Sequence, residues 1–276
     1  MLENLPRLVF LPVEILVIHE YHDDQRTPPL IESIRRSGVW RNPPIVTPLQ
    51  DGSGRYMVLD GANRTVALEK MGIPHALVQV VQPDDSGLRL YNWNHVVWGL
   101  EPGEFLAGLR RIDGLEITAG KDDRLDLWGD CGLASIQVAR GDFFTVCTQA
   151  YDLVERLQGL HAIVNSYKDR AHIDRTSEWS VVRLKAVYPD LSGLVIFPHF
   201  EVRQVMQLAG AGYLLPTGIT RFAVSPRALH INYPLDELAD EKPLEEKNAA
   251  LQRFIHERVK QKGVRYYAEA TVLFDE

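Results

Sequence analysis

The chain has 276 residues, 45% of them hydrophobic, and a formal net charge of −7. This length and composition suit one large or two modest domains with a proper core. Acidic residues outnumber basic ones by 37 to 30, which argues against a surface built to bind a polyanion. No stretch approaches the ~20 apolar residues of a membrane span, and the first residues lack a signal-peptide layout, so we expect a cytoplasmic protein with no membrane contact.

Sequence motifs argue against several common chemistries. The chain contains no GxxxxGK[ST] phosphate loop, no GxGxxG dinucleotide fingerprint, no GxSxG nucleophile elbow and no HExxH zinc motif. Its two cysteines, Cys131 and Cys147, are too few for a disulfide framework and too far apart for a CxxC site, so we expect buried or inert thiols. A nucleotide would therefore need another kind of phosphate site.

The first part of the chain predicts an α/β unit. The apolar run Leu8–Ile18 predicts a strand, and Thr27–Gly38 has the apolar face and the glycine stop of a helix. A hairpin, a helix and a further strand are expected at residues 45–59, 62–71 and 76–81. Residues 82–87 have the composition of a linker. We therefore predict an N-terminal domain over residues 1–85.

The remaining residues, 86–276, are predicted to form a second domain that mixes strands with helices. Expected strands cover residues 133–138, 143–147, 180–187, 193–197 and 264–274, and expected helices cover residues 105–112, 153–164, 201–208 and 251–259. No internal repeat is visible. The predicted fold class is therefore α/β, with a mixed α+β arrangement of sheets and helices.

The segment Val58–Leu68 is the strongest candidate for a functional site. It predicts a strand that ends in Asp60, a glycine at Gly61, and a helix start that carries Arg64. N–H groups at a helix start lack internal partners and favour an anion, and an arginine adds a bidentate donor. Gly61 permits close approach of a ligand, and Asp60 is suited to hold Mg²⁺ or accept a proton. Because Asp-Gly is also an ordinary turn or helix cap, the pattern alone leaves both interpretations open.

Three further polar groups fall where strands are expected to end or loops to begin. They are His19-Glu20, Trp93 to His95, and Thr217 to Arg221. Ligands bind beyond the carboxyl ends of strands in open α/β sheets, so we expect the first group and Asp60 to face one crevice. Each group also has an ordinary structural interpretation, as a solvated carboxylate, a core aromatic or turn hydroxyls. His19 and His22 have a metal-binding spacing without an evident third ligand.

Taken together, these segments resemble a known family. His19-Glu20, a helix, Arg41–Val46, a hairpin and Asp60–Arg64 resemble the ParB/sulfiredoxin-like N-terminal domain, in which a GxxR helix start holds nucleotide phosphates. The whole chain resembles the free L-serine kinases of the SerK and SbnI type, and Leu215–Phe222 resembles part of their serine site. The resemblance implies transfer of a phosphoryl group from ADP or ATP to free L-serine, giving O-phospho-L-serine, with Mg²⁺ as the metal.

The resemblance also implies roles by position. Glu20 corresponds to the catalytic glutamate beside the serine hydroxyl, and Asp60 to the aspartate near the transferred phosphate and the metal. The nucleotide phosphates are expected at Asn42, Gly61, Ala62, Asn63, Arg64 and Thr65. The amino acid is expected at His19, Trp93, His95, Thr217, Thr220 and Arg221. The chemistry agrees, because a carboxylate can accept the hydroxyl proton, Mg²⁺ and Arg64 can neutralise phosphoryl charge, and Arg221 can pair with the substrate carboxylate.

Two alternative functions stay open. The ParB-like N-terminus also suits a nucleotide- or metabolite-responsive DNA-binding regulator, but partitioning proteins continue with a basic helical segment and this chain does not. A nucleic-acid partner is therefore less expected than a nucleotide with free L-serine. Family members often carry histidines where this chain has Ala62 and Asn63, which leaves a silent binding module as the second alternative. The sequence does not separate ADP from ATP, or serine from close analogues.

Overall fold

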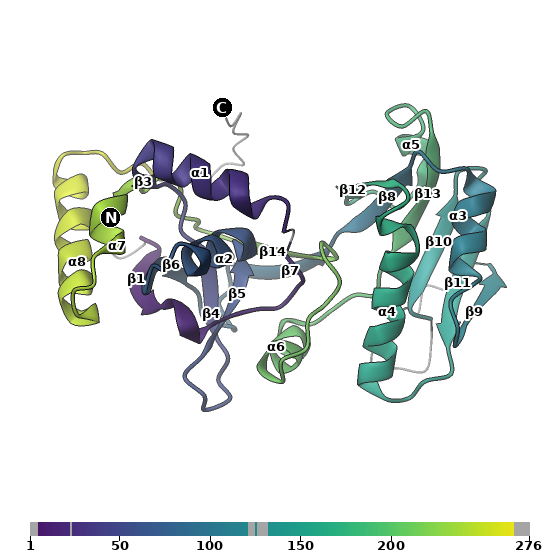
Figure 1. The fold of residues 1–276 in the computed structure, drawn as a ribbon, viewed down its shortest axis with the longest axis horizontal. Coiled ribbons are helices and arrows are strands. Elements are labelled where there is room, and N and C mark those ends of the chain that lie inside the picture. The colour runs from purple at the N-terminus through teal and green to yellow at the C-terminus, as the bar shows by residue number, and fades with distance from the viewer. Residues whose placement is uncertain (1–4, 23, 121–124, 126–131, 268–276) are drawn as a thin grey trace. The chain divides into compact units, whose positions relative to one another are not determined.

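The protein is described by a computed structural model that covers residues 5–22, 24–120, 125 and 132–267 (Figure 1). Cys131 lies outside the described residues. The chain divides into two compact units: unit 1 comprises Met1–Ile18, His22–Leu88 and Val224–Glu276, and unit 2 comprises His19–Tyr21 and Arg89–Ala223. The chain thus passes from unit 1 to unit 2 close to the predicted boundary at residue 85, and its C-terminal segment groups with unit 1.

Unit 1 is built on a mixed five-stranded sheet with the strand order β1-β6-β4-β5-β2. Its strands are β1 (Arg7–Pro12), β2 (Leu16–Ile18), β4 (Ile45–Pro48), β5 (Tyr56–Asp60) and β6 (His75–Val80). β1 is antiparallel to β6 and β4 to β5, whereas β2 is parallel to β5 and β4 to β6. The predicted β4–β5 hairpin is confirmed.

The prediction of one strand over Leu8–Ile18 is wrong. The run forms two strands at opposite edges of the sheet, β1 and β2, joined by the short 3-10 helix η2 (Val13–Ile15). Pro12 is the last residue of β1, and a proline has no N–H with which to continue strand pairing. His19 and Glu20 follow β2 directly in the chain.

The helices of unit 1 come from both ends of the chain. They are α1 (Thr27–Ser37), α2 (Ala62–Lys70), α7 (Leu235–Ala239) and α8 (Leu244–Lys260), and two short strands, β3 (Val39–Trp40) and β15 (Tyr233–Pro234), pair antiparallel. Phe10 of β1 lies in one buried cluster with Tyr233, Leu238 and Leu251. The ring of Tyr233 packs edge-on against Phe10 and Phe254, with centroids 5.5 and 5.0 Å away. The C-terminal segment therefore completes the hydrophobic core of unit 1.

Unit 2 contains an antiparallel six-stranded sheet with the order β12-β8-β13-β10-β11-β9. Its strands are β8 (Asn94–Trp98), β9 (Leu115–Ala119), β10 (Ala134–Val138), β11 (Phe143–Thr148), β12 (His172–Thr176) and β13 (Leu191–Ile196). Its helices are α3 (Pro102–Leu109), α4 (Leu153–Lys168), α5 (Val181–Leu184) and α6 (Val202–Gly210). A two-stranded sheet pairs β7 (Leu88–Asn92) with β14 (Thr220–Val224).

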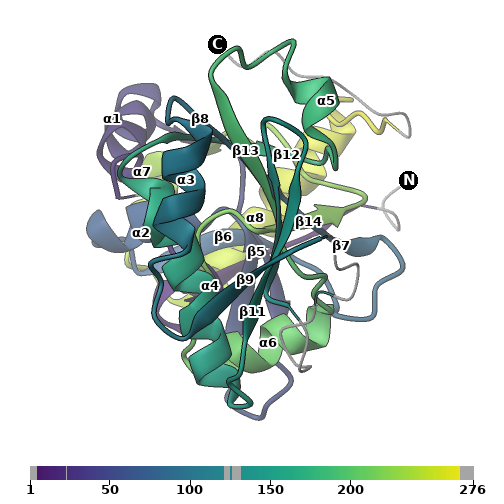
Figure 2. The same cartoon turned by 90° about the vertical axis from the view of Figure 1, so that its right-hand side faces the viewer.

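The two faces of the six-stranded sheet carry different helices. Figure 2 shows α3 and α4 side by side, and Tyr167 of α4 packs against His95 of β8. On α5, Val181 and Leu184 instead pack with Val96 of β8. Because successive side chains of a strand point to opposite faces, β8 contributes to both layers. His95 therefore belongs to the layer beneath α4.

Two predicted elements of the second half are wrong in the described residues. Residues 180–187 are not a strand: they contain α5, whose start is capped by the Ser180 side chain, which accepts from Val182 N. The buried residues Val181 and Leu184 are spaced as on one face of a helical turn. The predicted strand over residues 264–274 is absent from Val264–Tyr267, and the rest of it lies outside the described residues.

The remaining observations fit the predicted class. Sheets and helices mix in both units, so the mixed α/β fold class is confirmed.

Among the helices of the described residues, none has both the length and the apolar character needed to cross a bilayer.

Candidate functional site

The first candidate site lies in unit 1, where β5 passes into α2. Gly61 occupies the position before the helix with φ of +100°. A Cβ added there would lie 2.9 Å from Arg64 Nη2 and 3.1 Å from Pro44 Cα. Only glycine combines this backbone conformation with so close an approach. The N–H groups that follow have no acceptors within the helix, as at any helix start.

Asp60, the last residue of β5, joins two arginines at this helix start. Arg64 Nη2 donates to Asp60 Oδ2 over 2.8 Å, and Arg227 Nη2 donates to the same oxygen. The three side chains are between 25% and 38% exposed. Among the described residues, the buried Nε of Arg64 has no hydrogen-bond partner. We call Asp60, Gly61, Arg64 and Arg227 the helix-start cluster; its charged side chains carry one positive charge in excess.

Arg227 is a residue that the sequence analysis missed. The buried side-chain amide of Gln79 in β6 holds both chain neighbours of Arg227. Gln79 Nε2 donates to Pro226 O over 2.9 Å, and Oε1 accepts from Ala228 N over 2.8 Å. Gln79 is only 2% exposed, so these bonds fix the loop to the sheet. No local signal in the sequence pairs Arg227 with Asp60, because the two are 167 positions apart.

The other predicted nucleotide-binding residues also lie in unit 1. Asn42 Oδ1 accepts from His230 N over 2.9 Å, so this side chain holds the same C-terminal loop that carries Arg227. Ala62 and Asn63 are the first two residues of α2. Thr65 donates its hydroxyl to Gly61 O over 3.2 Å. Their contacts with a nucleotide stay a prediction.

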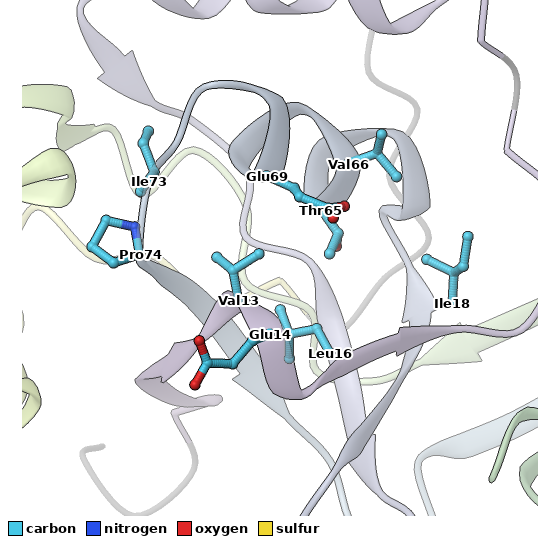
Figure 3. Close-up of a pocket in the computed structure, with 9 residues that line it drawn as sticks. All are labelled: Val13, Glu14, Leu16, Ile18, Thr65, Val66, Glu69, Ile73 and Pro74. Carbon is cyan, nitrogen blue, oxygen red and sulfur yellow. The ribbon is translucent and has the colours of Figure 1, made fainter. Parts of the chain in front are cut away.

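A pocket of about 320 Å³ lies beside α2 in unit 1 (Figure 3). Its lining is formed by Val13, Glu14, Leu16, Ile18, Thr65, Val66, Glu69, Ile73 and Pro74. Glu14 and Glu69 make the polar part of this lining acidic, which disfavours a phosphate by charge repulsion. The helix-start cluster, with two arginines to one aspartate, is therefore the better phosphate site of the two.

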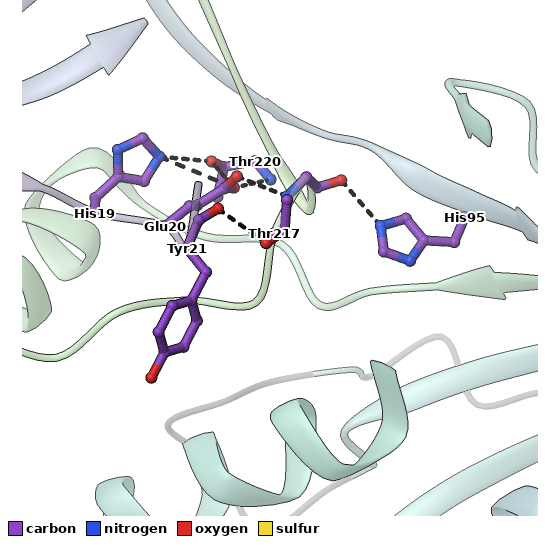
Figure 4. Close-up of polar contacts among 7 residues, drawn as sticks. His19, Glu20, Tyr21, His95, Thr217 and Thr220 are labelled. Atoms are coloured by element: carbon purple, nitrogen blue, oxygen red, sulfur yellow. Dashed lines mark hydrogen bonds and ion pairs between the residues drawn. The ribbon is translucent and has the colours of Figure 1, made fainter. Parts of the chain in front are cut away.

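The second candidate site lies in unit 2, where Glu20 holds the turn before β14 (Figure 4). Glu20 Oε2 accepts from Gly218 N over 2.7 Å, and Oε1 accepts from Thr220 N over 2.7 Å and from the Thr220 hydroxyl. The Glu20 side chain is 13% exposed. Since each carboxylate oxygen accepts about two hydrogen bonds, Oε2 keeps an acceptor position that these bonds do not fill. We call His19, Glu20, Thr217, Gly218 and Thr220 the turn cluster.

His19 and Thr217 complete the hydrogen bonds of this cluster (Figure 4). His19 Nε2 lies 2.8 Å from the Thr220 hydroxyl oxygen. Because that hydroxyl donates its own proton to Glu20, the imidazole donates from Nε2. The Thr217 hydroxyl donates to Tyr21 O over 2.8 Å. Both predicted threonine hydroxyls are therefore engaged within the protein.

His95 fixes the same turn from the interior. It is 2% exposed, its Nε2 lies 3.1 Å from Gly218 O, and its Nδ1 lies 2.9 Å from the Tyr167 hydroxyl. A carbonyl only accepts, so Nε2 donates and Nδ1 accepts from Tyr167. Burial lowers the pKa of His95 to about 4 and raises the pKa of Tyr167 well above its ordinary value. At neutral pH this pair is uncharged and holds the Gly218 carbonyl.

Arg221 and Trp93 are brought together by the structure. The guanidinium carbon of Arg221 lies 4.7 Å from the Trp93 ring centroid, a cation–π contact. Phe222 packs edge-on against His19, with centroids 5.2 Å apart. Alternation along β14 therefore places Arg221 on the opposite face from Thr220 and Phe222. Contact of Trp93 and Arg221 with the amino acid stays a prediction, as does the expectation that Glu20 and Asp60 face one crevice.

Metal ligation by the two early histidines gains no support from the described residues, where no three histidine, cysteine or carboxylate side chains gather in a way that could hold a metal ion. His22 Nε2 instead lies 2.9 Å from Asp24 Oδ1. Cys147, the other cysteine, is partly buried in β11, and its inert character stays a prediction.

Comparison with solved structures defines the class of fold. SbnI with a C-terminal truncation, from Staphylococcus aureus, matches with a TM-score of 0.71 and 23% identity over 91% of this chain and 97% of that one. A free serine kinase in complex with AMP matches with a TM-score of 0.69 and 18% identity over 84% of this chain and 93% of that one. At these identities the comparison establishes a shared fold.

Curated proteins with similar sequences are named for an activity. The ATP-dependent L-serine kinase SbnI of Staphylococcus aureus is 25% identical over 247 residues, 87% of each chain. An ATP-dependent L-serine kinase of Staphylothermus marinus is 31% identical over 119 residues, 42% of this chain and 46% of the relative. No family model matches the chain. The resemblance to the free L-serine kinases is confirmed by these relatives, and the ParB-like character of the N-terminal part stays a prediction.

Proposed function

We propose that this protein is a kinase that transfers a phosphoryl group from a nucleotide to the hydroxyl of free L-serine. The observation that carries the proposal is the similarity, over 87% of both chains, to a protein named ATP-dependent L-serine kinase. Solved relatives named free serine kinase hold AMP or, in one variant, ADP, which supports a nucleotide as the donor. These comparisons favour a kinase over a DNA-binding regulator.

The helix-start cluster suits the nucleotide phosphates. Arg64 and Arg227 share one oxygen of Asp60, and a guanidinium has five N–H donors, so both arginines keep donors for a phosphate. The N–H groups at the start of α2, which have no acceptors within the helix, lie at its positive end and favour an anion. Arginines and backbone amides of this kind stabilise the charge that develops on a phosphoryl group during transfer.

Asp60 is the residue that fits Mg²⁺ in this cluster. Mg²⁺ in kinases is held mainly by substrate phosphates and water, with one or two carboxylates from the protein. Asp60 meets that requirement because its side chain is 38% exposed, whereas the two neighbouring arginines make the cluster unsuited to a cation without phosphates. When bound with the nucleotide, the metal would neutralise phosphate charge.

The turn cluster suits the acceptor. The open acceptor position on Glu20 Oε2 is able to take a hydrogen bond from a serine hydroxyl. In the transfer, the hydroxyl oxygen forms a bond to the terminal phosphorus, the bond from that phosphorus to the rest of the nucleotide breaks, and the hydroxyl proton passes to the Glu20 carboxylate. ATP then leaves as ADP, or ADP as AMP, and the proton returns to water.

A phosphoryl-transfer assay on the purified full chain tests this function. L-serine and Mg²⁺ are incubated with ATP or with ADP, and O-phosphoserine is detected by mass spectrometry. We expect O-phosphoserine with at least one donor, and the relatives' names favour ATP. Its absence with both donors would refute the kinase proposal.

Two further measurements identify what would replace it. Binding of serine and nucleotide by titration calorimetry without turnover would support the silent module, to which Ala62 and Asn63 point. A salt-sensitive gel shift with DNA, in the absence of turnover, would support the regulator. The cytoplasmic location stays a prediction, to be checked by fractionation of the source cells.

A further inference from the structure

Arg175 of β12 lies directly over the turn that Glu20 holds. A Cβ added at Gly218 would lie 2.2 Å from Arg175 Nε and 2.5 Å from both Cζ and Nη2. Gly218 also has φ of +73°. The guanidinium group therefore lies against the α-carbon of residue 218, where the backbone conformation favours glycine.

The register of the sheet fixes this position. Arg175 is the direct cross-strand partner of His95, so both side chains leave the same face of the sheet. His95 bonds to the Gly218 carbonyl, and Arg175 covers the α-carbon of the same residue. Because His95 stays neutral at neutral pH, Arg175 supplies the positive charge at this turn.

Arg175 is available to a ligand, whereas three hydrogen-bond donors of the turn already have acceptors within the protein. Within the described part of the chain, its exposed side chain takes part in no ion pair and no side-chain hydrogen bond. The hydroxyls of Thr217 and Thr220 and the N–H of Gly218 all donate to acceptors within the protein. Arg175 thus offers a charged donor group next to a turn whose two threonine hydroxyls and Gly218 N–H already have acceptors.

We propose that Arg175 binds the α-carboxylate of the amino-acid substrate, through the paired N–H groups of its guanidinium. This inference rests on the proposed function, and it names the group that distinguishes an amino acid from a simple alcohol. A planar guanidinium matches a carboxylate in a bidentate geometry. In serine the carboxylate is only a few bonds from the hydroxyl, so one molecule can present the hydroxyl to Glu20, which bonds to Gly218 N, and the carboxylate to the arginine that covers Gly218.

Arg221, which the sequence favours for this task, is placed less suitably. Its guanidinium packs on Trp93, and it leaves β14 on the opposite face from Thr220, whose hydroxyl bonds to Glu20. Arg175, in contrast, covers Gly218, whose N–H bonds to Glu20. The structure therefore favours Arg175 over Arg221 as the carboxylate partner.

The test compares acceptors with and without a carboxylate. Wild type, Arg175→Gln and Arg175→Lys are assayed with L-serine and with L-serinamide, in which an uncharged amide replaces the carboxylate. We expect Arg175→Gln to raise KM for L-serine about 10- to 100-fold, with little further effect on L-serinamide, on kcat or on nucleotide affinity. Arg175→Lys keeps the charge without the paired donors, so its loss should be intermediate.

Controls separate substrate binding from support of the turn. Arg183→Gln serves as the matched control, because Arg183 is an exposed arginine of unit 2 whose side chain pairs with Glu178, at 3.5 Å. Added ethylguanidinium should restore L-serine binding to the Arg175→Gln protein, which a merely structural role would not allow. Melting temperatures of all variants show whether the turn has been disturbed.

Each outcome decides between the two proposals. An equal loss of both acceptors in Arg175→Gln, or an unchanged preference for L-serine over L-serinamide, would overturn the role of Arg175 while leaving the kinase in place. If no turnover is detected, calorimetric titration measures L-serine binding to wild type and to Arg175→Gln. Binding that Arg175→Gln abolishes would support the inference even if no phosphoserine formed, and no binding to wild type would overturn both proposals.

Discussion

Asp60 and Glu20 are the two carboxylates predicted to be catalytic, and the protein holds them in different ways. Asp60 is bonded by two arginine side chains and is 38% exposed, whereas Glu20 is bonded by two backbone N–H groups and a hydroxyl and is 13% exposed. Exposed ion pairs contribute only about 0–1 kcal/mol and exchange partners easily. Hydrogen bonds to the backbone of a shielded turn instead fix one conformation. The helix-start cluster is thus suited to exchanging a carboxylate for phosphate, and the turn cluster to holding a geometry.

The largest effect should come from breaking the turn cluster at its centre. Glu20→Gln removes the proton acceptor and places an amide NH₂ against one of the N–H groups of Gly218 and Thr220. We expect kcat to fall about 10²- to 10⁴-fold, with nucleotide affinity nearly unchanged. The measurement is steady-state kinetics with calorimetric nucleotide binding.

Glu178→Gln is the matched control for this substitution, because Glu178 is a half-exposed carboxylate of unit 2 paired with Arg183. It should leave kcat unchanged. Retention of full turnover by Glu20→Gln would exclude Glu20 as the base and leave it a purely structural role.

The next largest effect is the pH dependence of stability that buried His95, which bonds to the turn, should cause. The pKa of His95 is about 4 in the folded protein and about 6.5 in an unfolded chain, because burial disfavours the charged imidazole. Between these values the unfolded chain binds a proton that the folded one does not. The contribution of neutral His95 to the free energy of unfolding is therefore complete above pH 6.5. It falls by on the order of 3 kcal/mol as the pH is lowered towards 4.

Urea unfolding of wild type and His95→Gln between pH 7.5 and 4, in steps of about 0.5, checks this expectation. The variant should start less stable and lose less stability on acidification. His199→Gln, at an exposed histidine of unit 2, is the comparison. Parallel pH curves for wild type and His95→Gln would contradict the assignment.

The smallest expected effect is a change in nucleotide affinity on substitution in the helix-start cluster. Arg227→Gln removes one of two guanidinium groups from the helix-start cluster, so we expect nucleotide Kd to rise about tenfold. The stability of the fold should change little, because an exposed ion pair is lost. Wild-type nucleotide affinity should also fall more steeply with salt than that of Arg227→Gln.

Arg36→Gln, on the exposed face of α1, controls for a general change in charge. An unchanged Kd in Arg227→Gln would show that Arg64 and the helix start suffice for the phosphates.

Local patterns in the sequence identify part of both clusters. Asp60, Gly61 and Arg64 are predictable because they lie within one helical turn and need no knowledge of the tertiary fold. Glu20, Thr217 and Thr220 are identified through the family motif. Their mutual hydrogen bonds depend on the pairing of residues 19–21 with Leu215, which no local pattern encodes.

The residues that sequence reasoning missed depend on register and on long-range contacts. Arg175 reaches the turn because it lies opposite His95 in a strand pair, and β12 itself was not predicted. Arg227 reaches Asp60 through a loop held by Gln79. The apolar run Leu8–Ile18 was taken for one strand because hydrophobic periodicity is the same for one long strand as for two short ones.

The core of unit 1 has a consequence for synthesis on the ribosome. Phe10, in the first strand, packs with Tyr233 and Leu251, and Asp60 meets Arg227. Nascent chains emerge from the N-terminus at a finite rate, and domains usually fold as they emerge. Here the earliest residues must wait until the whole intervening unit has been translated, so the core of unit 1 is completed last.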